Sequence, residues 1–167
     1  YITWSRKISL LSLGDVACAA APIGIFLVRI ANFINGELYG RPTSVPWGMR
    51  FPTYDWTTRE WVYRGDEQVV HPSQIYQALL EGAAVFVILA IAIWRFGSLK
   101  RPGLTAGLFL VSYALFRTFS EQFREPDAFT QGVLPSFLTM GMLLSIPMLV
   151  GGVWLMARTR PFSRHAA

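Results

Sequence analysis

Long apolar stretches separated by polar connections are the dominant pattern in this chain. Four stretches approach the roughly 20 residues that a helix needs to cross a bilayer core; they cover residues 16–34, 78–96, 104–123 and 137–157. We therefore expect an all-α fold, a polytopic membrane protein with about four transmembrane helices. Residues 1–167 then form a single membrane-embedded domain.

Composition supports the membrane interpretation. Hydrophobic residues make up 53% of the 167 residues and charged residues only 15%, against about 25% charged residues in soluble domains. The single cysteine, Cys18, excludes an intrachain disulfide. The net charge of +5 comes from basic residues spread along the chain rather than clustered on one predicted face, which argues against a nucleic-acid partner.

The basic residues predict how the helices are oriented. Those near the ends of the apolar stretches precede the first span, fill the second connection or follow the last span: Arg6, Lys7, Arg95, Lys100, Arg101, Arg158, Arg160 and Arg164. Because basic residues favour the cytoplasmic side, both ends of this chain and the second connection are expected there. The long connection of residues 35–72 and the third connection then face outward.

The outward connection at residues 35–72 is rich in aromatic residues, which suit the membrane–water interface. Residues 60–63 and 68–70 flank a polar segment and could pair as a small hairpin. Pro72 is expected in the first turn of the second helix, capped by His71 or a neighbour.

Arg29 and Asn32 interrupt the first apolar stretch one turn apart, on nearly the same helix face. An arginine at the centre of a membrane helix costs about 2.5–3.5 kcal/mol on insertion scales, so such a residue is a candidate for function. The alternative is a purely structural role. Arg29 would then extend its side chain to the lipid headgroups, and Asn32 would form a hydrogen bond to a neighbouring helix.

The third apolar stretch carries Tyr113, Arg117, Glu121 and Arg124 at spacings of four, four and three residues. These spacings place all four side chains on one helix face. One interpretation is an ion-paired seam between helices. The other is an anion site, because two arginines for one glutamate leave a positive surplus, which Arg29 enlarges at the same depth.

The expected helix directions bring these polar residues together. The first and third helices both run outward, and residues 71–76 open the second, inward-running helix. All of them should lie in or just above the outer half of the bilayer. Because arginine offers planar, paired donors that match phosphate oxygens, an outer-leaflet anionic phospholipid is the expected ligand.

Several ordered motifs resemble one known family. They are RIANFINGELYGR at residues 29–41, HPSQIYQALLEG at residues 71–82, the segments FR and FREPD between residues 116 and 127, and the residues around 140–148. In order and spacing they resemble the bacterial prolipoprotein diacylglyceryl transferases. The resemblance covers nearly the whole chain.

The resemblance implies a transferase of the bacterial inner membrane with its site facing the periplasmic leaflet. Its members move a diacylglyceryl group from phosphatidylglycerol to the lipobox cysteine thiol of a lipoprotein precursor and release glycerol phosphate. The implied partners are therefore phosphatidylglycerol, a lipoprotein precursor and the membrane. Residues 35–72 become a periplasmic connection. No cofactor is implied.

The resemblance also implies roles for single residues. Arg117, as an arginine that holds the departing phosphate, and Tyr113, as a tyrosine important for activity, are the expected catalytic residues. Arg29 is expected to contact the lipid headgroup. The other expected substrate-binding positions are Asn32, Glu37 and Gly40 from the signature, and His71, Gln74 and Glu121, for which a structural role is an equal alternative. No metal site is expected, because His71 and His165 lie on opposite predicted sides of the membrane.

The chain also departs from the family pattern. It begins with Tyr1 and has neither the additional N-terminal helices nor the histidine-glycine-glycine block that holds the family's essential histidine, so we expect a fragment of a longer enzyme. Val28 and Ala31 replace glycines often found in the signature. No catalytic base can be assigned. The alternatives are a noncatalytic module that binds or transports anionic phospholipid, an inactive truncated remnant, or a purely structural bundle.

Overall fold

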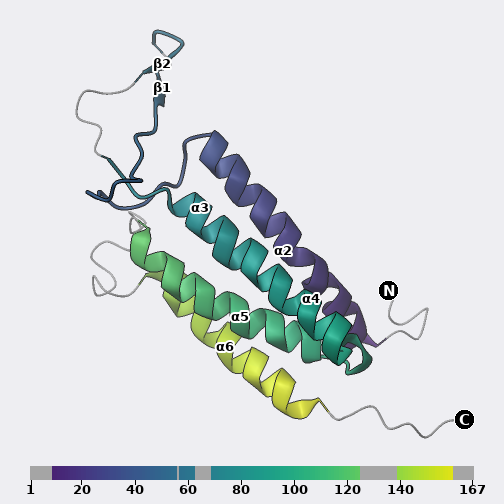
Figure 1. Ribbon diagram of the computed structural model, residues 1–167. Helices are drawn as coiled ribbons and strands as arrows, with labels where there is room; N and C mark the ends of the chain where they lie inside the picture. Colours follow the sequence, from purple (N-terminus) through teal and green to yellow (C-terminus); the bar gives the residue numbers. More distant parts are fainter. Residues whose placement is uncertain (1–8, 56, 63–68, 125–138, 160–167) are drawn as a thin grey trace, which may run out of the picture.

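The structure is a computed structural model that describes residues 9–55, 57–62, 69–124 and 139–159. Long antiparallel helices lie side by side, and a small β-hairpin projects beyond one end of the bundle (Figure 1). The helices are α2 (Leu10–Ile34), α3 (Ser73–Gln77), the π-helix η1 (Ala78–Ala84), α4 (Val85–Phe96), the 3₁₀ turn η2 (Ser98–Lys100), α5 (Leu104–Ser120), the 3₁₀ turn η3 (Glu121–Phe123) and α6 (Met140–Arg158).

The helices agree with the predicted all-α, multi-pass membrane fold, with shifted ends. Three of them are long and apolar enough to cross a membrane, namely Leu10–Ile34, the continuous helix Ser73–Phe96, and Met140–Arg158. The fourth predicted span corresponds to α5, which has 17 residues and is extended by η3 to Phe123. The first span begins at Leu10 rather than at residue 16. Residues 137 and 138, predicted to start the last span, lie outside the described part.

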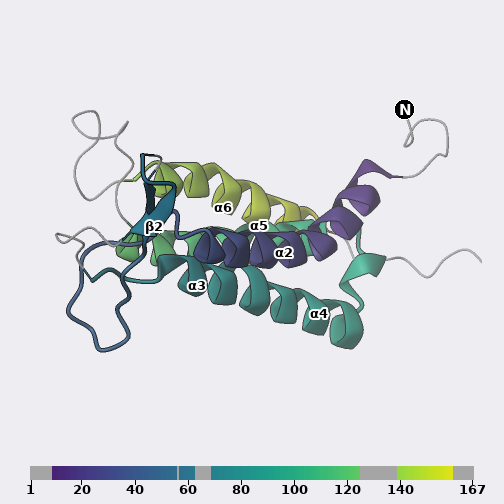
Figure 2. The same cartoon turned by 90° about the horizontal axis from the view of Figure 1, so that it is seen from above.

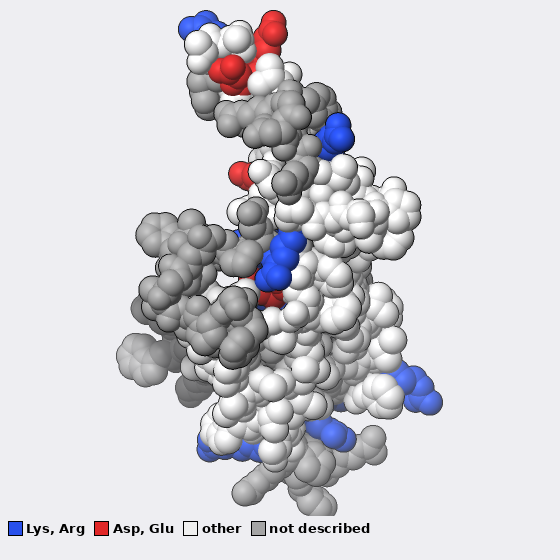
Figure 3. Space-filling model, turned by 90° about the vertical axis from the view of Figure 1, so that its left-hand side faces the viewer, with Lys and Arg blue, Asp and Glu red and all other residues white. Residues whose placement is uncertain are grey.

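The distribution of side chains is typical of a membrane protein. Large apolar side chains cover the outside of the bundle, and buried positions include carboxylates, amides and hydroxyls. The flank of the molecule is accordingly almost free of charge, and basic groups gather at the end opposite the hairpin (Figure 3). Described basic residues near that end are Arg95, Lys100, Arg101 and Arg158.

The apolar core lies between α2, α4 and α5. Val85, Leu89 and Phe109 are buried there and contact one another, with partly buried side chains of α2 and α5 packed around them. Pro22 lies inside α2, which bends toward its N-terminal end (Figure 2); proline removes one backbone hydrogen bond and is a common cause of such bends.

Helices α5 and α6 pack backbone to backbone. A Cβ atom added at Gly107 would lie 2.9 Å from the carbonyl oxygen of Gly152, and one added at Gly152 would lie 2.8 Å from that of Gly107. Small residues of this kind let membrane helices approach closely. The pair holds α6 against α5 at a point nearer to the start of α5 than Tyr113 and Arg117.

The connection after α2 is hydrogen-bonded to the segment before α3 and to the end of η3. The backbone amide of Gly40 donates to the carbonyl of His71 at 2.9 Å, and that of Arg41 donates to the carbonyl of Phe123 at 2.9 Å. A Cβ atom at Gly40 would collide with Phe123 and His71. Only a glycine fits between these two backbones, so Gly40 ties three separate segments together.

The hairpin differs from the prediction. Strand β1 (Thr53–Asp55) pairs antiparallel with β2 (Glu60–Val62), so residues 60–62 pair with the preceding segment instead of with residues 68–70. Val70 forms bridges with Pro42 and Met49 instead, and residues 63–68 lie outside the described part. Residues 57–59 provide a turn before β2, with Arg59 in a left-handed conformation. Pro72 precedes the helix, which starts at Ser73, and therefore does not occupy the first turn.

Asp15, a residue of α2, caps the N-terminus of α5. Its side chain is buried, and its two carboxylate oxygens accept hydrogen bonds of 2.7 Å from the backbone amides of Gly103 and Ala106. These amides belong to the first turn of α5, where backbone donors have no partner within their own helix. The carboxylate thus replaces the side-chain cap that the N-cap residue Gly103 cannot supply.

We expect Asp15→Ala to lower the free energy of unfolding by about 2 kcal/mol, because it leaves two buried amides without acceptors. Ser9→Ala is the matched control, since Ser9 is the N-cap of α2 but makes no side-chain capping bond. Thermal unfolding in detergent micelles would measure both. Equal stability of the two variants would contradict the capping role.

Gly82 marks the closest approach of α2 to the second span. A Cβ atom there would lie 2.7 Å from the Cβ and 2.8 Å from the Cα of Phe26. We expect Gly82→Ala to force the two helices apart and to destabilise the protein by about 2 kcal/mol, a typical cost of overpacking. Gly24→Ala on α2 is the control, because its added Cβ would meet no atom within 4 Å. The same unfolding measurement tests both, and an undisturbed Gly82→Ala variant would refute the close approach.

Candidate functional site

Glu81 lies at the centre of the polar residues inside the bundle. Its Oε1 atom accepts a hydrogen bond of 2.6 Å from the Ser120 hydroxyl and lies 3.4 Å from an Arg117 guanidinium nitrogen. Its Oε2 atom lies 3.6 Å from a guanidinium nitrogen of Arg29. One carboxylate therefore links α2, the second span and α5.

The ion pairs continue past the end of α5 into η3 and Arg124. Glu121 lies 3.2 Å from Arg117 and 3.8 Å from Arg124, measured between carboxylate oxygens and guanidinium nitrogens. Five charged side chains thus form an alternating chain in the order Arg29, Glu81, Arg117, Glu121, Arg124. We call this chain the charge network. Glu121 thus pairs with both neighbouring arginines.

Burial separates the two signs of charge within the network. The carboxylate side chains of Glu81 and Glu121 are 0% and 2% exposed, while the three arginine side chains retain between 13% and 16% exposure. The carboxylates lie inside, and part of each guanidinium group reaches the surface. A ligand arriving from outside would therefore meet positive charge first.

The charge network lies inside the membrane-spanning part of the helices, near the hairpin end of the bundle. Arg29 is five residues before the end of α2 and Glu81 is eight residues after Ser73. At 1.5 Å per residue these positions are about 8 Å and about 12 Å from the helix ends. Charge–charge attraction is strong at such depth because little water screens it.

Local backbone features make room for the two carboxylates. Glu81 lies in the π-helix η1, a widened form of helix that is frequent at functional sites. The neighbouring Gly82 lets α2 approach and thereby brings Arg29 within reach. A Cβ atom at Gly141 of α6 would lie 2.6 Å from Glu121 Oε2, so this glycine leaves the space that the second carboxylate fills.

Tyr113 belongs to the same cluster. Its hydroxyl interacts electrostatically with Glu81, Arg117 and Arg29, and its ring stacks on Phe109 of the apolar core. The two residues expected to be catalytic, Tyr113 and Arg117, thus lie together with the expected headgroup ligand Arg29. The convergence predicted for α2 and α5 is confirmed.

Other predicted site residues organise the turn after α2. The Gln74 amide nitrogen donates to the backbone carbonyl of Glu37 at 2.7 Å, and the carbonyl of Asn32 accepts from the Glu37 amide at 3.0 Å. The Glu37 carboxylate is exposed and accepts a hydrogen bond from Asn35. These contacts hold the signature turn against the start of α3.

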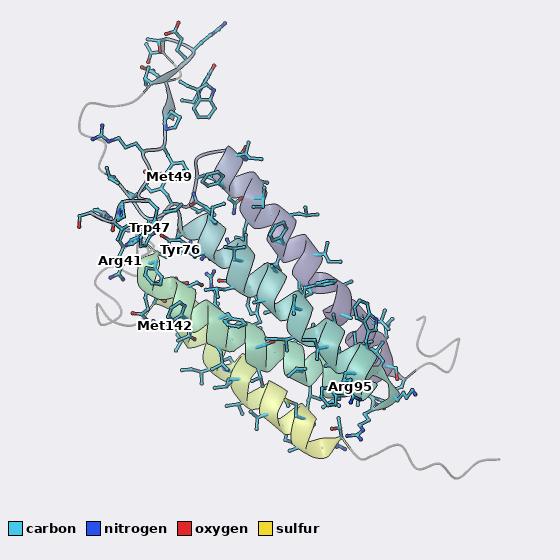
Figure 4. The ribbon with its side chains drawn as sticks, viewed as in Figure 1. Arg41, Trp47, Met49, Tyr76, Arg95 and Met142 are labelled. Carbon is cyan, nitrogen blue, oxygen red and sulfur yellow. The ribbon has the colours of Figure 1, made fainter. Side chains whose placement is uncertain are left out.

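His71 and Gly40 lie at the surface end of the bundle. The His71 ring packs against Phe123 and Tyr76, and its Nδ1 atom lies 3.3 Å from the Tyr76 hydroxyl. That hydroxyl also accepts a hydrogen bond of 2.7 Å from Trp47. Figure 4 shows Trp47, Tyr76 and the neighbouring Arg41 gathered where α3 begins. The contacts described for His71 join it to this aromatic cluster.

Sequence reasoning missed Glu81 and Ser120. Glu81 lies inside the second apolar stretch, where an ionisable residue is as strong a signal as Arg29. Including it corrects the expected charge balance. The network holds three arginines and two glutamates, so its surplus is one positive charge rather than two.

This arrangement can hold an anion in a fixed geometry. Guanidinium groups from two helices are anchored by a shared carboxylate, so they are oriented before a ligand arrives. Preorganised donors of this kind stabilise developing negative charge strongly where water is scarce. A phosphate ester is the ligand that paired guanidinium donors match best.

Comparison with known proteins agrees with the geometry. Residues 1–158 match the family model described as "Prolipoprotein diacylglyceryl transferase". The chain is 54% identical over 158 residues to the phosphatidylglycerol–prolipoprotein diacylglyceryl transferase of Rhodopseudomonas palustris, covering 93% of this chain and 51% of that protein. Proteins of the same name from Azospirillum brasilense and Rhizobium meliloti are 50% and 49% identical, covering 94% and 95% of this chain and 55% and 54% of their own lengths.

The chain thus spans about half the length of these curated relatives. The match includes the segments that carry the charge network, from α2 through α6. The chain belongs to the prolipoprotein diacylglyceryl transferase family.

Proposed function

We propose that this chain supplies the lipid-headgroup site of an enzyme that transfers the diacylglyceryl group of phosphatidylglycerol to the lipobox cysteine thiol of a lipoprotein precursor. The observation that carries the proposal is the pair of partly exposed guanidinium groups of Arg29 and Arg117, held together by Glu81. The names of the relatives specify the two substrates.

The chemistry needs positive charge at this position. The thiol sulfur forms a bond to the terminal glyceryl carbon of the lipid, and the bond from that carbon to the phosphate oxygen breaks. Glycerol phosphate leaves with the electron pair of the broken bond, so its negative charge grows during the reaction. Arg29 and Arg117 would stabilise the transition state more than the ground state, which is the requirement for catalysis.

The thiol proton must pass to a base, because the thiolate is the reactive form. We assign that role to no residue of the charge network, since its two carboxylates are occupied by arginines. Tyr113 adjoins Arg117 and is proposed to contact the phosphate. Asn32, Glu37, Gly40, His71 and Gln74 are proposed to contribute to substrate binding.

The proposed location is the bacterial inner membrane, with the site in the periplasmic leaflet. Basic residues at the end of the bundle opposite the site support this orientation, because the cytoplasmic side favours them. In this orientation the network lies at the depth of an outer-leaflet headgroup. Residues 35–72 then form the periplasmic connection.

Noncatalytic lipid binding is the alternative that the ion pairs also favour, because a network that neutralises most of its own charge can serve packing and binding alone. The two functions differ in one measurement. Purified full-length gene product is mixed with vesicles containing phosphatidylglycerol and with a lipobox peptide. A labelled diacylglyceryl group on the peptide supports the enzyme, whereas vesicle binding without transfer supports the module.

In this assay we expect Arg29→Ala and Arg117→Ala each to reduce kcat/KM for transfer at least about 100-fold, because each removes a donor aimed at the developing phosphate charge. Arg59→Ala is the control, since Arg59 is exposed on the hairpin turn, and its activity should be unchanged. Wild-type turnover in both test variants would count against the assigned roles.

A further inference from the structure

We propose that Glu81 is a positioning residue for the transfer reaction, a buried anionic stand-in that holds Arg29 and Arg117 in register before the lipid phosphate arrives. The inference rests on the proposed function and assigns a role to a residue that the sequence motifs alone did not single out.

The two arginines come from different helices and carry the same charge. Arg29 approaches Glu81 Oε2 at 3.6 Å from α2, and Arg117 approaches Oε1 at 3.4 Å from α5. Without a negative charge between them, the guanidinium groups would repel each other in a region of weak screening. The shared carboxylate therefore sets the separation of the two donors.

Glu81 itself has little freedom to move. Its side chain is fully buried, the Ser120 hydroxyl donates to Oε1 at 2.6 Å, and the backbone beside it contacts Phe26 through Gly82. Oε2 lies 3.6 Å from a guanidinium nitrogen of Arg29, and Tyr113 also interacts electrostatically with the carboxylate. The carboxylate is thus a fixed point, and the arginines are arranged around it.

This placement has opposite effects on binding and on chemistry. A negative charge beside both arginines weakens their attraction for another anion, so Glu81 lowers the affinity for the lipid headgroup. It also keeps the donors in the geometry that the departing phosphate requires, and a misplacement of about 1 Å can cost 100-fold in rate. A residue of merely structural importance would not combine these two effects.

The test measures kcat and KM for phosphatidylglycerol separately in the full-length gene product, with the folded fraction fixed by thermal unfolding. For Glu81→Gln we expect kcat to fall 10- to 100-fold and KM to fall several-fold, because the amide removes the competing charge along with the anchor. For Glu81→Asp, which keeps the charge on a shorter side chain, we expect a smaller fall in kcat and an unchanged KM. Glu60→Gln on the exposed strand β2 is the matched control and should change neither value.

Ser120→Ala provides a second test that leaves every charge in place. It removes the 2.6 Å hydrogen bond that fixes Oε1, so we expect kcat to fall several-fold with KM unchanged. This variant decides the matter if Glu81→Gln does not fold, and a wild-type kcat in Ser120→Ala would then overturn the proposal.

The remaining outcomes are distinct. A folded Glu81→Gln protein with wild-type kcat, or with lowered kcat and unchanged KM, would overturn the positioning role while leaving the proposed function intact. A wild-type protein that transfers nothing to the lipobox peptide would overturn the proposed function, and this inference with it.

Discussion

The arrangement of this bundle depends on the burial of two carboxylates among three guanidinium groups. An ionised side chain removed from water is costly unless it is paired and hydrogen-bonded. Glu81 meets that condition by taking one arginine from α2 and one from α5, together with the Ser120 hydroxyl. Helices that could otherwise slide along one another are therefore fixed at this level, because sliding would leave a buried charge without its partner.

Glycines make this pairing possible at short range. Gly82 brings α2 against the second span, Gly141 leaves room for Glu121, and Gly40 fits between the backbones of His71 and Phe123. Each of them removes a side chain where two segments meet around the polar residues. Because van der Waals packing contributes much of helix association in membranes, the same glycines support the bundle and set the distances between the charges.

The sequence predicted the all-α membrane fold, the alternating directions of successive helices and the meeting of Arg29 with the Arg117 face, because the length of the apolar stretches reports on insertion into a bilayer. It did not predict Glu81 as the link, since residue spacing along one helix does not tell which side chain of a neighbouring helix lies opposite. The hairpin partner was wrong because alternation over three residues cannot choose between two neighbouring segments. In both cases the residue types were known from the sequence, but the segment that lies opposite them in the fold was not.

A network that is almost neutral inside and positive at its edge suits a ligand whose charge grows during a reaction. Complete neutralisation would leave nothing to attract a phosphate, whereas three unpaired arginines would bind an anion tightly and repel one another in its absence. Two buried carboxylates for three partly exposed arginines lie between these limits. The fixed carboxylates set the positions of the guanidinium groups, whose exposed edges are accessible to an anion. The ion-paired seam that the contacts show is therefore compatible with the anion site that we propose for the same residues.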